Sequence, residues 1–310
     1  MAAYLEQLVN GLVLGSIIGL IALGYTMVYG VIQLINFAHG EVFMVGAYAS
    51  LACYLWILPP DLAGTWYIAL PAMILFGSLV AALLAIAMER FAYRPLRGAP
   101  RLAPLITALG VSVFLQEVVR LFFPDAKQAK PYPTPFIEGG ITVHLGDGQF
   151  TIAYIRILLV VVAIGLAALL QLYISRSRMG RAMRAIANDP DTARLMGINP
   201  DRIIVWTFVI GAVLAGVAGV FYGGYQNTIN TDMGFQNGIF AFTAAVLGGI
   251  GSIRGAVVGA MIIGVVKTIA GQLPFLGGTQ YDYVWIFVVL IFMLVFRPQG
   301  FFGETERVRA

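Results

Sequence analysis

The sequence has few charged residues, few histidines and a single cysteine. Its 310 residues include 19 Lys or Arg and 15 Asp or Glu, 11% of the chain, whereas about a quarter of a soluble protein is charged. So few charges cannot cover a water-exposed surface, and a chain that is 60% hydrophobic is not intrinsically disordered. The lone Cys53 excludes a fold held by disulfides. These absences leave a polytopic membrane protein.

Motifs for nucleotide binding, hydrolysis and metal ligation are missing as well. The run 259–264 has the glycine spacing of a Walker A loop, but Val265 follows where that loop has lysine. There is no G-x-S-x-G or H-E-x-x-H motif, and His39 and His144 are too few for a transition-metal site of usual density. An intramembrane hydrolase needs a nucleophile and a base. Ser50 with His39 is the best candidate pair in this sequence, and it is a weak one. We predict that this chain is not an enzyme and holds no metal or cofactor itself.

Basic residues are distributed unevenly, and none precedes Arg90. From there most of the arginines fall into three blocks: Arg90, Arg94, Arg97 and Arg101; Arg176, Arg178, Arg181, Arg184, Arg194 and Arg202; and Arg297, Arg307 and Arg309. The positive-inside rule places all three blocks in the cytoplasm. The net charge of +4 is therefore an orientation signal and not a nucleic-acid footprint, so no nucleic acid is expected as a partner.

Apolar runs of the length that crosses a membrane fill most of the chain. A hydrocarbon core of about 30 Å takes about 20 apolar residues. The runs that meet or approach this length are 4–31, 42–58, 66–88, 104–123, 154–174, 202–223, 238–250, 256–273 and 283–297. Nine crossings place the N-terminus outside and the C-terminus inside. Because 238–250 is short, it can instead be a re-entrant half-helix.

The expected fold is therefore an all-α polytopic membrane protein, a bundle of about 8–9 transmembrane helices with broken or re-entrant segments. Residues 1–310 form a single transmembrane domain. A loop at about 124–153, rich in Pro and Gly and with strand-like and turn-like pieces, is extracytoplasmic. The loop at about 175–202 carries six of the arginines and is cytoplasmic.

Two polar or small-residue breaks interrupt the apolar runs. The first, 30–41, contains Gln33, Asn36, His39 and Glu41, and the second, 247–255, contains Gly248, Gly249, Gly251 and Ser252. Transporters use broken helices of this kind to expose backbone groups along a substrate path. The alternative for the first break is an ordinary cytoplasmic turn. We predict that these eight residues line the path, and a break after a short helix in each half suggests internal duplication.

Glycines recur at helical spacing within the apolar runs. One stripe is Gly11, Gly15 and Gly19, and another is Gly251, Gly255 and Gly259. Such stripes let helix backbones approach closely in a membrane. They indicate helix packing within one subunit, with a subunit interface as the alternative.

Within the predicted spans we single out three charged residues. Glu117 and Arg120 are three apart, so they can pair on one helix face and offset most of the cost of burial in lipid. Lys267 has no evident local partner. Charges inside the membrane are usually functional or paired across helices.

The loop 175–202 is predicted to contain two short amphipathic helices. The first ends at 188–190, and the second, capped by Asp189 or Asp191 with Pro190 near its first position, closes at Gly197. The loop is either a solvated basic connector or a docking surface for a cytoplasmic partner.

Four stretches carry a resemblance to a known family. Residues 191–197 (DTARLMG) resemble a degenerate form of the EAA loop by which ABC importer permeases engage their ATPases, although the I-x-L-P that often completes it is not recognisable. Residues 34–48 (LINFAHGEVFMVGAY), 242–252 (FTAAVLGGIGS) and 296–303 (FRPQGFFG) are similar to the branched-chain amino-acid ABC transporter permeases. The length and the N-terminal run resemble the shorter H-type subunit. Arg254 stands where a smaller residue or proline is expected.

The resemblance implies a permease subunit of an ATP-driven importer for leucine, isoleucine and valine in a bacterial or archaeal cytoplasmic membrane. It also implies a second, related permease subunit, two cytoplasmic ATPase subunits that hold ATP and Mg, and an extracytoplasmic substrate-binding protein. The ATPase-coupling residues would be Arg184, Asp191, Ala193, Leu195 and Gly197. Relatives of this family also carry urea, amides or other amino acids, so those substrates stay open. An ion-coupled secondary carrier, with Glu117 and Lys267 as its titratable groups, is the remote alternative.

Overall fold

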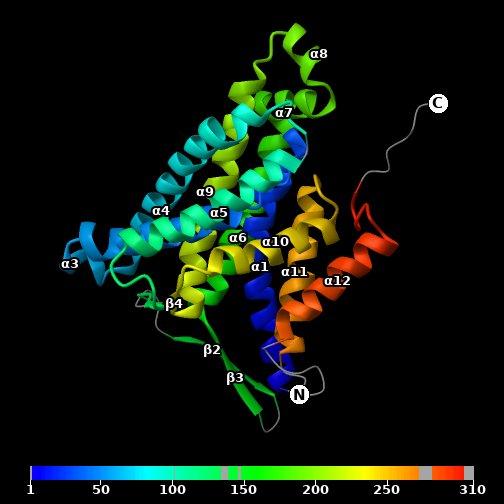
Figure 1. Cartoon of the computed structure of the whole chain (residues 1–310). Coiled ribbons are helices and arrows are strands. Elements are labelled where there is room, and N and C mark those ends of the chain that lie inside the picture. The colour runs from blue at the N-terminus through cyan, green and yellow to red at the C-terminus, as the bar shows by residue number, and fades with distance from the viewer. Residues whose placement is uncertain (1, 101, 134–138, 146–147, 272–280, 304–310) are drawn as a thin grey trace.

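The computed structural model describes residues 2–100, 102–133, 139–145, 148–271 and 281–303, and these form a bundle of helices with two small two-stranded pairs at one end (Figure 1). Arg101, Arg307 and Arg309 of the arginine blocks lie outside the described residues. The all-α polytopic fold expected from the sequence is confirmed.

Seven helical stretches of the described chain are long and apolar enough to cross a membrane. They are α1 (Ala2–Ile32), α2 (His39–Ala52) with the π-helix η1 (Cys53–Ile57), α4 (Trp66–Met88) with η2 (Glu89–Tyr93) and η3 (Arg94–Leu96), α5 (Leu102–Phe122), α6 (Tyr154–Arg176), α9 (Pro200–Gln226) and α11 (Ile253–Ala270). Two shorter apolar helices are α10 (Met233–Gly248) and α12 (Asp282–Phe296). The nine apolar runs of the sequence therefore all coincide with helices. α10 begins at Met233, earlier than the 238 expected, because Met233, Gly234 and Asn237 are buried in the bundle rather than part of the preceding loop.

α1 lies at the centre of the bundle, and the glycine stripes explain how closely its neighbours approach. A Cβ added to Gly15 would lie 2.8 Å from the carbonyl oxygen of Ala260, and one added to Gly11 would lie 2.7 Å from the Cα of Val265. Gly259 approaches Ala244 of α10 in the same way, with 2.1 Å to its carbonyl oxygen. Real Cβ atoms do not fit at these distances, so the stripes pack helices within this one chain.

One end of the bundle carries the strands. β2 (Gly140–Leu145) and β3 (Gly148–Ala153) form an antiparallel hairpin, as the strand-like pieces of the loop suggested. β1 (Lys130–Pro131) pairs with β4 (Thr228–Ile229), which follows α9. Beside this pair the Tyr132 hydroxyl lies 2.6 Å from Ser50 Oγ inside the bundle, so the loop is anchored to α2.

The other end carries the arginine-rich loop, whose helices are α7 (Arg178–Asn188) and α8 (Pro190–Leu195). The N-terminal end of α1 and this loop lie at opposite ends of the bundle (Figure 1). The short helix α3 (Pro60–Ala63) lies between α2 and α4 in the chain. The segment after α12 returns to the loop end, because Phe302 lines the same cavity as Arg184.

Candidate substrate path and coupling surface

The first polar break is folded back into the bundle. α1 ends at Ile32, the exposed Gln33 has a φ of +52°, and α2 begins at His39. The His39 ring lies against Gly24, because a Cβ added to Gly24 would be 2.0 Å from His39 Nε2. Gly24 precedes Ile32 by roughly two helical turns, about 12 Å along α1. α2 therefore begins well inside the bundle, which is the geometry of a broken helix and not of an exposed turn.

Asn36 and His39 are both buried in this break. The Tyr93 hydroxyl donates to Asn36 Oδ1 over 2.5 Å, which ties the break to the end of α4 and η2. The His39 ring packs edge-on against Tyr25 of α1, with 5.0 Å between ring centroids. Within the described part of the chain, His39 Nε2 has no hydrogen-bond partner. Asn36 is thus a structural tie, whereas His39 keeps a polar atom unused.

Glu41 is completely buried in the first turn of α2. Its Oε1 accepts hydrogen bonds from Ser112 Oγ at 2.9 Å and from Gln116 Nε2 at 2.8 Å, both on α5. Its Oε2 has no partner among the described residues and faces Gly234 of α10. A buried polar atom without a partner is costly, which makes the Glu41 carboxylate a candidate site.

The N-terminal ends of α2 and α10 meet beside Glu41. A Cβ added to Gly40 of α2 would lie 2.2 Å from the carbonyl oxygen of Gly234, in the first turn of α10. Only glycine on both helices permits this approach. The start of α10 is therefore held against the start of α2, next to the buried Glu41 carboxylate.

A charged group lies on α5 near Glu41. Arg120 donates to Glu117 and to Asp232, both at 2.6 Å, and to Thr231 Oγ1 at 2.9 Å. The Glu117–Arg120 pair expected from the sequence is therefore present. The side chains of Glu117 and Asp232 are 52% and 58% exposed, so the group lies open on the surface of this chain.

The second break, between α10 and α11, holds the C-terminal segment. The backbone N–H of Phe301 donates to Leu247 O at 3.0 Å, and that of Phe302 donates to Gly248 O at 2.9 Å. Gly249 has a φ of +101°, a conformation that disfavours every residue with a Cβ. Two stretches that carry the family resemblance, 242–252 and 296–303, are thus bonded to each other through their backbones.

The four predicted residues of this break divide into two roles. Gly248 and Gly249 pack against backbone, because a Cβ added to Gly248 would be 1.9 Å from Gly255 O. Gly251 and Ser252 instead line a cavity, and Ser252 Oγ also caps α11 by accepting from the N–H of Gly255 at 3.2 Å. Only the latter two lie where a solute could reach them.

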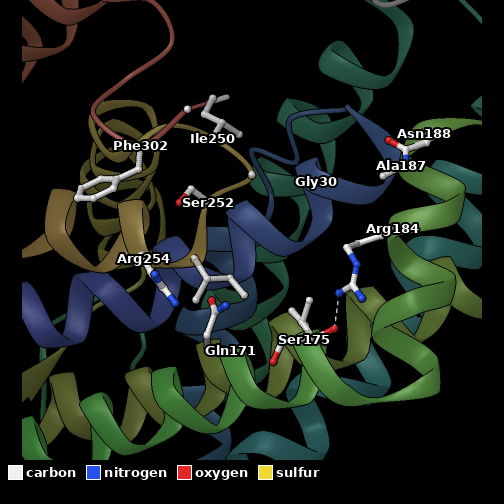
Figure 2. Close-up of a pocket in the computed structure, with 14 residues that line it drawn as sticks. Gly30, Gln171, Ser175, Arg184, Ala187, Asn188, Ile250, Ser252, Arg254 and Phe302 are labelled. Carbon is white, nitrogen blue, oxygen red and sulfur yellow. Dashed lines mark hydrogen bonds between the residues drawn. The ribbon is translucent and has the colours of Figure 1, made fainter. Parts of the chain in front are cut away.

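That cavity has a volume of about 650 Å³ and brings the two breaks together (Figure 2). A Cβ added to Gly30 of the first break would lie 3.7 Å from the Cα of Gly251 in the second. The cavity is lined by Gly30, Gln171, Ile174, Ser175, Arg184, Ala187, Asn188, Ile250, Gly251, Ser252, Ile253, Arg254, Phe302 and Gly303.

A second cavity of about 460 Å³ lies on the other side of the end of α7. Gln33 lines it, together with Arg97 and Arg194. Ala187 and Asn188 line both cavities, so the end of α7 separates them. Gln33 is therefore apart from Glu41 and close to the arginine-rich loop.

The two helices of the loop begin and end as the sequence indicates. Asp189 caps α8, accepting from the N–H groups of Asp191 at 2.9 Å and Thr192 at 3.1 Å, so Asp189 and not Asp191 is the cap. The Thr192 hydroxyl donates to the same carboxylate, and these hydrogen bonds hold the pKa of Asp189 below its ordinary value. The chain leaves α8 through Gly197, whose φ is +80°.

The loop presents apolar side chains to solvent. Leu195 is 87% exposed and Met196 is 79% exposed, whereas Ala193 on the inner side of α8 is buried. The Asp191 carboxylate is also exposed, with Arg194 at 3.8 Å. Arg184 on α7 donates to the carbonyl oxygen of Ile174 at 2.5 Å, which joins the loop to the end of α6.

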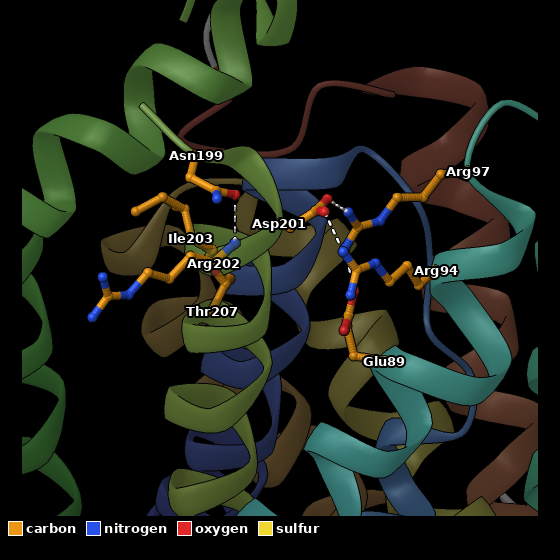
Figure 3. Close-up of polar contacts among 8 residues, drawn as sticks. All are labelled: Glu89, Arg94, Arg97, Asn199, Asp201, Arg202, Ile203 and Thr207. Atoms are coloured by element: carbon orange, nitrogen blue, oxygen red, sulfur yellow. Dashed lines mark hydrogen bonds and ion pairs between the residues drawn. The ribbon is translucent and has the colours of Figure 1, made fainter. Parts of the chain in front are cut away.

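An ion-pair network joins the start of α9, directly after this loop, to the segment that follows α4, which contains η2, η3 and Arg97 (Figure 3). Asp201 accepts from Arg94 and Arg97, and Arg97 also donates to the buried Glu89. Asn199 caps α9 through the N–H of Arg202 at 3.2 Å, which fixes the position of Asp201. The loop is therefore bonded to the segment after α4 as well as to α6.

Lys267 lies apart from both breaks, on α11. Its Nζ is 4.3 Å from the centroid of the Phe240 ring on α10, a cation–π contact that the sequence did not indicate. Among the described residues, no group of three or more His, Cys, Asp or Glu is placed to hold a metal ion.

Sequence reasoning missed several residues of these sites. Ser112 and Gln116 are four apart in an apolar run, a spacing that marks one polar face of a helix and could have been noticed. Tyr93, Glu89 and Asp201 gave no such signal, because their partners are distant in the sequence.

Comparisons with known proteins agree on one family. Residues 7–294 match the family model described as the branched-chain amino acid transport system / permease component. The chain is 46% identical to the high-affinity branched-chain amino acid transport system permease protein BraD of Pseudomonas aeruginosa, over 98% of this chain and 97% of that one. It is 41% identical to the corresponding permease protein LivH of Escherichia coli, over 98% and 96%.

A weaker match concerns a second permease of the same kind of system. The chain is 27% identical to the permease protein LivM of Escherichia coli over 132 residues, which is 42% of this chain and 30% of that one. The two kinds of permease subunit thus share sequence over part of their length.

Proposed function

This chain belongs to the branched-chain amino-acid transport permease family, and on that premise we propose that it is the membrane subunit of an ATP-driven importer of leucine, isoleucine and valine. The chain is a transport subunit, and ATP with Mg binds to two separate cytoplasmic ATPase subunits. A substrate-binding protein delivers the amino acid from the other side. The arginine-rich loop then lies in the cytoplasm and the N-terminus outside.

The observation that carries the coupling role is the exposure of Leu195 and Met196 on a loop with fixed geometry. Exposed apolar side chains on a short helix, rimmed by charges, suit insertion into a groove of a partner protein. The Asp189 cap and Gly197 hold the shape of this surface, and the buried Ala193 packs it onto the rest of the loop. Arg184 and Asp201 would pass a movement of the loop to α6 and to the segment after α4.

The exposed charges of α5 support a second permease subunit as the neighbour of this face. Glu117 and Asp232 cannot face hydrocarbon at low cost, so this face meets either protein or a water-filled path. The match to LivM supports a related chain as that neighbour. The path then runs between the two permease subunits, past Glu117 and the helix ends that meet at Gly40 and Gly234.

In this mechanism, closure of the ATPase pair displaces the loop, and α6 and α9 reorient around the path in alternating access. The path itself binds the zwitterionic substrate weakly, because the delivery protein supplies selection. The unpartnered Oε2 of Glu41 and Nε2 of His39 lie beside the moving helix ends, where a change of state can give them partners.

The coupling role is tested with the whole importer in vesicles, measuring ATP hydrolysis stimulated by the loaded binding protein. Leu195→Asp changes only an exposed side chain, so the complex should insert normally and lose stimulated hydrolysis and transport. Leu195→Met is the matched control and should retain both. Gly197→Arg and Ala193→Asp should also uncouple the complex, by deforming α8. Normal transport by Leu195→Asp and Gly197→Arg together would disprove the docking role.

Substrate choice is tested in the same vesicles with radiolabelled leucine and competitors. Isoleucine and valine should compete strongly, and urea, acetamide or a cationic amino acid should not. Uptake of urea or an amide in place of leucine would assign the chain to the other substrates of its family. Uptake by the chain alone in vesicles without any ATPase would instead indicate an ion-coupled carrier.

A further inference from the structure

The cavity of about 650 Å³ contains two arginines, of which the transport mechanism uses only the hydrogen bond from Arg184 to Ile174 O. Arg184 extends from α7 and Arg254 from the first turn of α11 (Figure 2). The residues that line the cavity include no carboxylate, and neither arginine forms an ion pair within the part of the chain that the structure describes. The cavity therefore has an uncompensated positive charge.

The position of Arg254 adds to this imbalance. The first turn of a helix carries the positive end of the helix dipole, where a cation is disfavoured and an anion is favoured. The polar groups around it, Gln171, Ser175 and Ser252, can donate hydrogen bonds but carry no negative charge. The chemistry of the cavity thus suits an anion with several oxygen atoms, such as a phosphate group.

The height of the cavity in the bundle places that anion in the headgroup layer of the membrane. Gly30 belongs to the last turn of α1, Ser175 to the last turn of α6 and Ile253 to the first turn of α11. All three helices are long enough to cross a membrane, so their ends lie near one of its surfaces. The arginine-rich loop lies at the same end, which the positive-inside rule assigns to the cytoplasmic leaflet.

A shallow, mostly apolar groove lies nearer the middle of the bilayer than this cavity. The groove has a volume of only about 10 Å³. α1 forms its floor through Ser16, Gly19, Leu20 and Leu23, and its walls are Ala163, Ile164 and Ala167 of α6 and Val257 and Met261 of α11. Ala167 is one turn before Gln171, and Val257 is one turn after Ile253, so groove and cavity follow the same faces of α6 and α11. The groove is too small to enclose an acyl chain, so a lipid chain would lie over it, against the exposed Ile164. The level of the cavity in the membrane, and not the groove, favours a lipid phosphate over a free phosphate ion.

We propose that the Arg184–Arg254 cavity and the groove between α6 and α11 form a binding site for an anionic phospholipid. The phosphate binds Arg254 and the free N–H groups of Arg184, and one acyl chain lies over the groove. Basic pockets between transmembrane helices at the cytoplasmic surface recognise anionic headgroups by this chemistry. The bound lipid would join α6, α7 and α11, beside the loop that is proposed to move.

The test uses the assembled importer, purified in a neutral detergent and titrated with phosphatidylglycerol or with phosphatidylcholine of the same acyl chains. Phosphatidylglycerol should raise the Tm of the complex more than phosphatidylcholine does. Arg254→Gln should lose at least half of this difference, and Arg254→Lys, which keeps the charge, should retain more of it. Arg202→Gln is the matched control, because Arg202 lies on α9 and does not line the cavity.

Two further arms separate the sources of the anion and test the groove. Inorganic phosphate and glycerol 3-phosphate should not reproduce the shift; equal shifts would assign the cavity to a soluble anion. Val257→Trp should fill the groove and reduce the shift, whereas Val258→Trp, on an exposed side chain next to it, should not.

The proposal fails if Arg254→Gln keeps the full difference between the two lipids, or if both tryptophan variants behave as the wild type. It also fails if the effect appears in the isolated chain but not in the assembled complex, because a partner subunit would then cover the cavity. Stimulated ATP hydrolysis measured in phosphatidylcholine alone tests the proposed transport role separately from the lipid site.

Discussion

The backbone N–H of Phe302 donates to the carbonyl oxygen of Gly248 over 2.9 Å, so the segment after the last helix closes the turn between α10 and α11. The turn and the segment are about fifty residues apart in the chain and form one unit through backbone atoms alone. Side-chain substitutions at Phe302 therefore leave this bond intact, whereas a change of backbone conformation in the turn breaks it.

Three glycine-to-alanine substitutions separate backbone strain from crowding. Gly249→Ala should destabilise the protein most, because φ is +101° and the new Cβ would lie 2.4 Å from the backbone nitrogen of Gly303. Gly251→Ala has a similar φ of +97° but no neighbour within 4 Å, so we expect only the strain, about 1 to 3 kcal/mol. Gly165→Ala, with neither feature, should be neutral. Thermal unfolding in detergent measures the order, and equal effects at Gly249 and Gly165 would contradict this account.

The contact between α1 and α11 gives a second matched pair. Gly15→Ala places a Cβ 2.8 Å from Ala260 O and should force the helices apart, while Gly19→Ala meets only the Ala260 Cβ at 3.5 Å, an ordinary contact. Overpacking of this kind costs about 1 to 3 kcal/mol. The yield of folded protein and its Tm should fall for Gly15→Ala alone. A fall of the same size for Gly19→Ala would contradict the conclusion that α1 and α11 approach more closely at Gly15 than at Gly19.

The ion pairs at the start of α9 predict that the loss of Arg97 destabilises the protein more than the loss of Arg94. Arg97→Gln leaves the buried Glu89 carboxylate without its partner and should lower the free energy of unfolding by about 3 to 5 kcal/mol. Arg94→Gln removes a contact between half-exposed side chains and should cost less than about 1 kcal/mol. In the double variant Glu89→Gln with Arg97→Gln, part of the loss should be recovered, as a double-mutant cycle would measure. Additive effects would mean that Glu89 and Arg97 do not interact.

Tyr132 predicts sensitivity to alkaline pH. Burial raises the pKa of its hydroxyl above the ordinary value of about 10, so the folded state holds the proton more tightly than the unfolded state does. The corresponding stability is complete below pH about 10 and is lost as the pH rises through the folded pKa. Tyr132→Phe removes the 2.6 Å contact with Ser50, so its Tm should be lower than that of the wild type at neutral pH. As the pH rises from about 9.5 to about 11, around the ordinary tyrosine pKa, its Tm should fall less than that of the wild type. Parallel curves for both proteins would contradict the assignment.

The helices could be predicted because lipid imposes a simple rule, one apolar run for each crossing. The run at 66–88 coincides with α4 from Trp66 to Met88, and Pro190 and Gly197 correctly bounded α8. The start of α10 at Met233 could not be predicted, because Gln236 and Asn237 look like loop residues and Asn237 is buried only through packing against other helices.

The sequence indicated which residues of the candidate sites stand out, but not which residues they contact. Glu41 and Asn36 stood out as polar groups in an apolar context, but their partners Gln116 and Tyr93 come from helices far along the chain. Arg97 was interpreted only as a marker of orientation, since nothing in one sequence links it to Asp201. Contacts between distant elements depend on the packing of the whole bundle, which local patterns do not contain.

Ala187 and Asn188 line cavities on both of their sides, one of about 650 Å³ and one of about 460 Å³. Most protein interiors are packed as densely as organic crystals, and a helix there can move only if its neighbours move with it. The end of α7 has clearance instead. A push on α8 would move this end towards open space on either side, while the hydrogen bond from Arg184 to Ile174 O passes the movement on to α6.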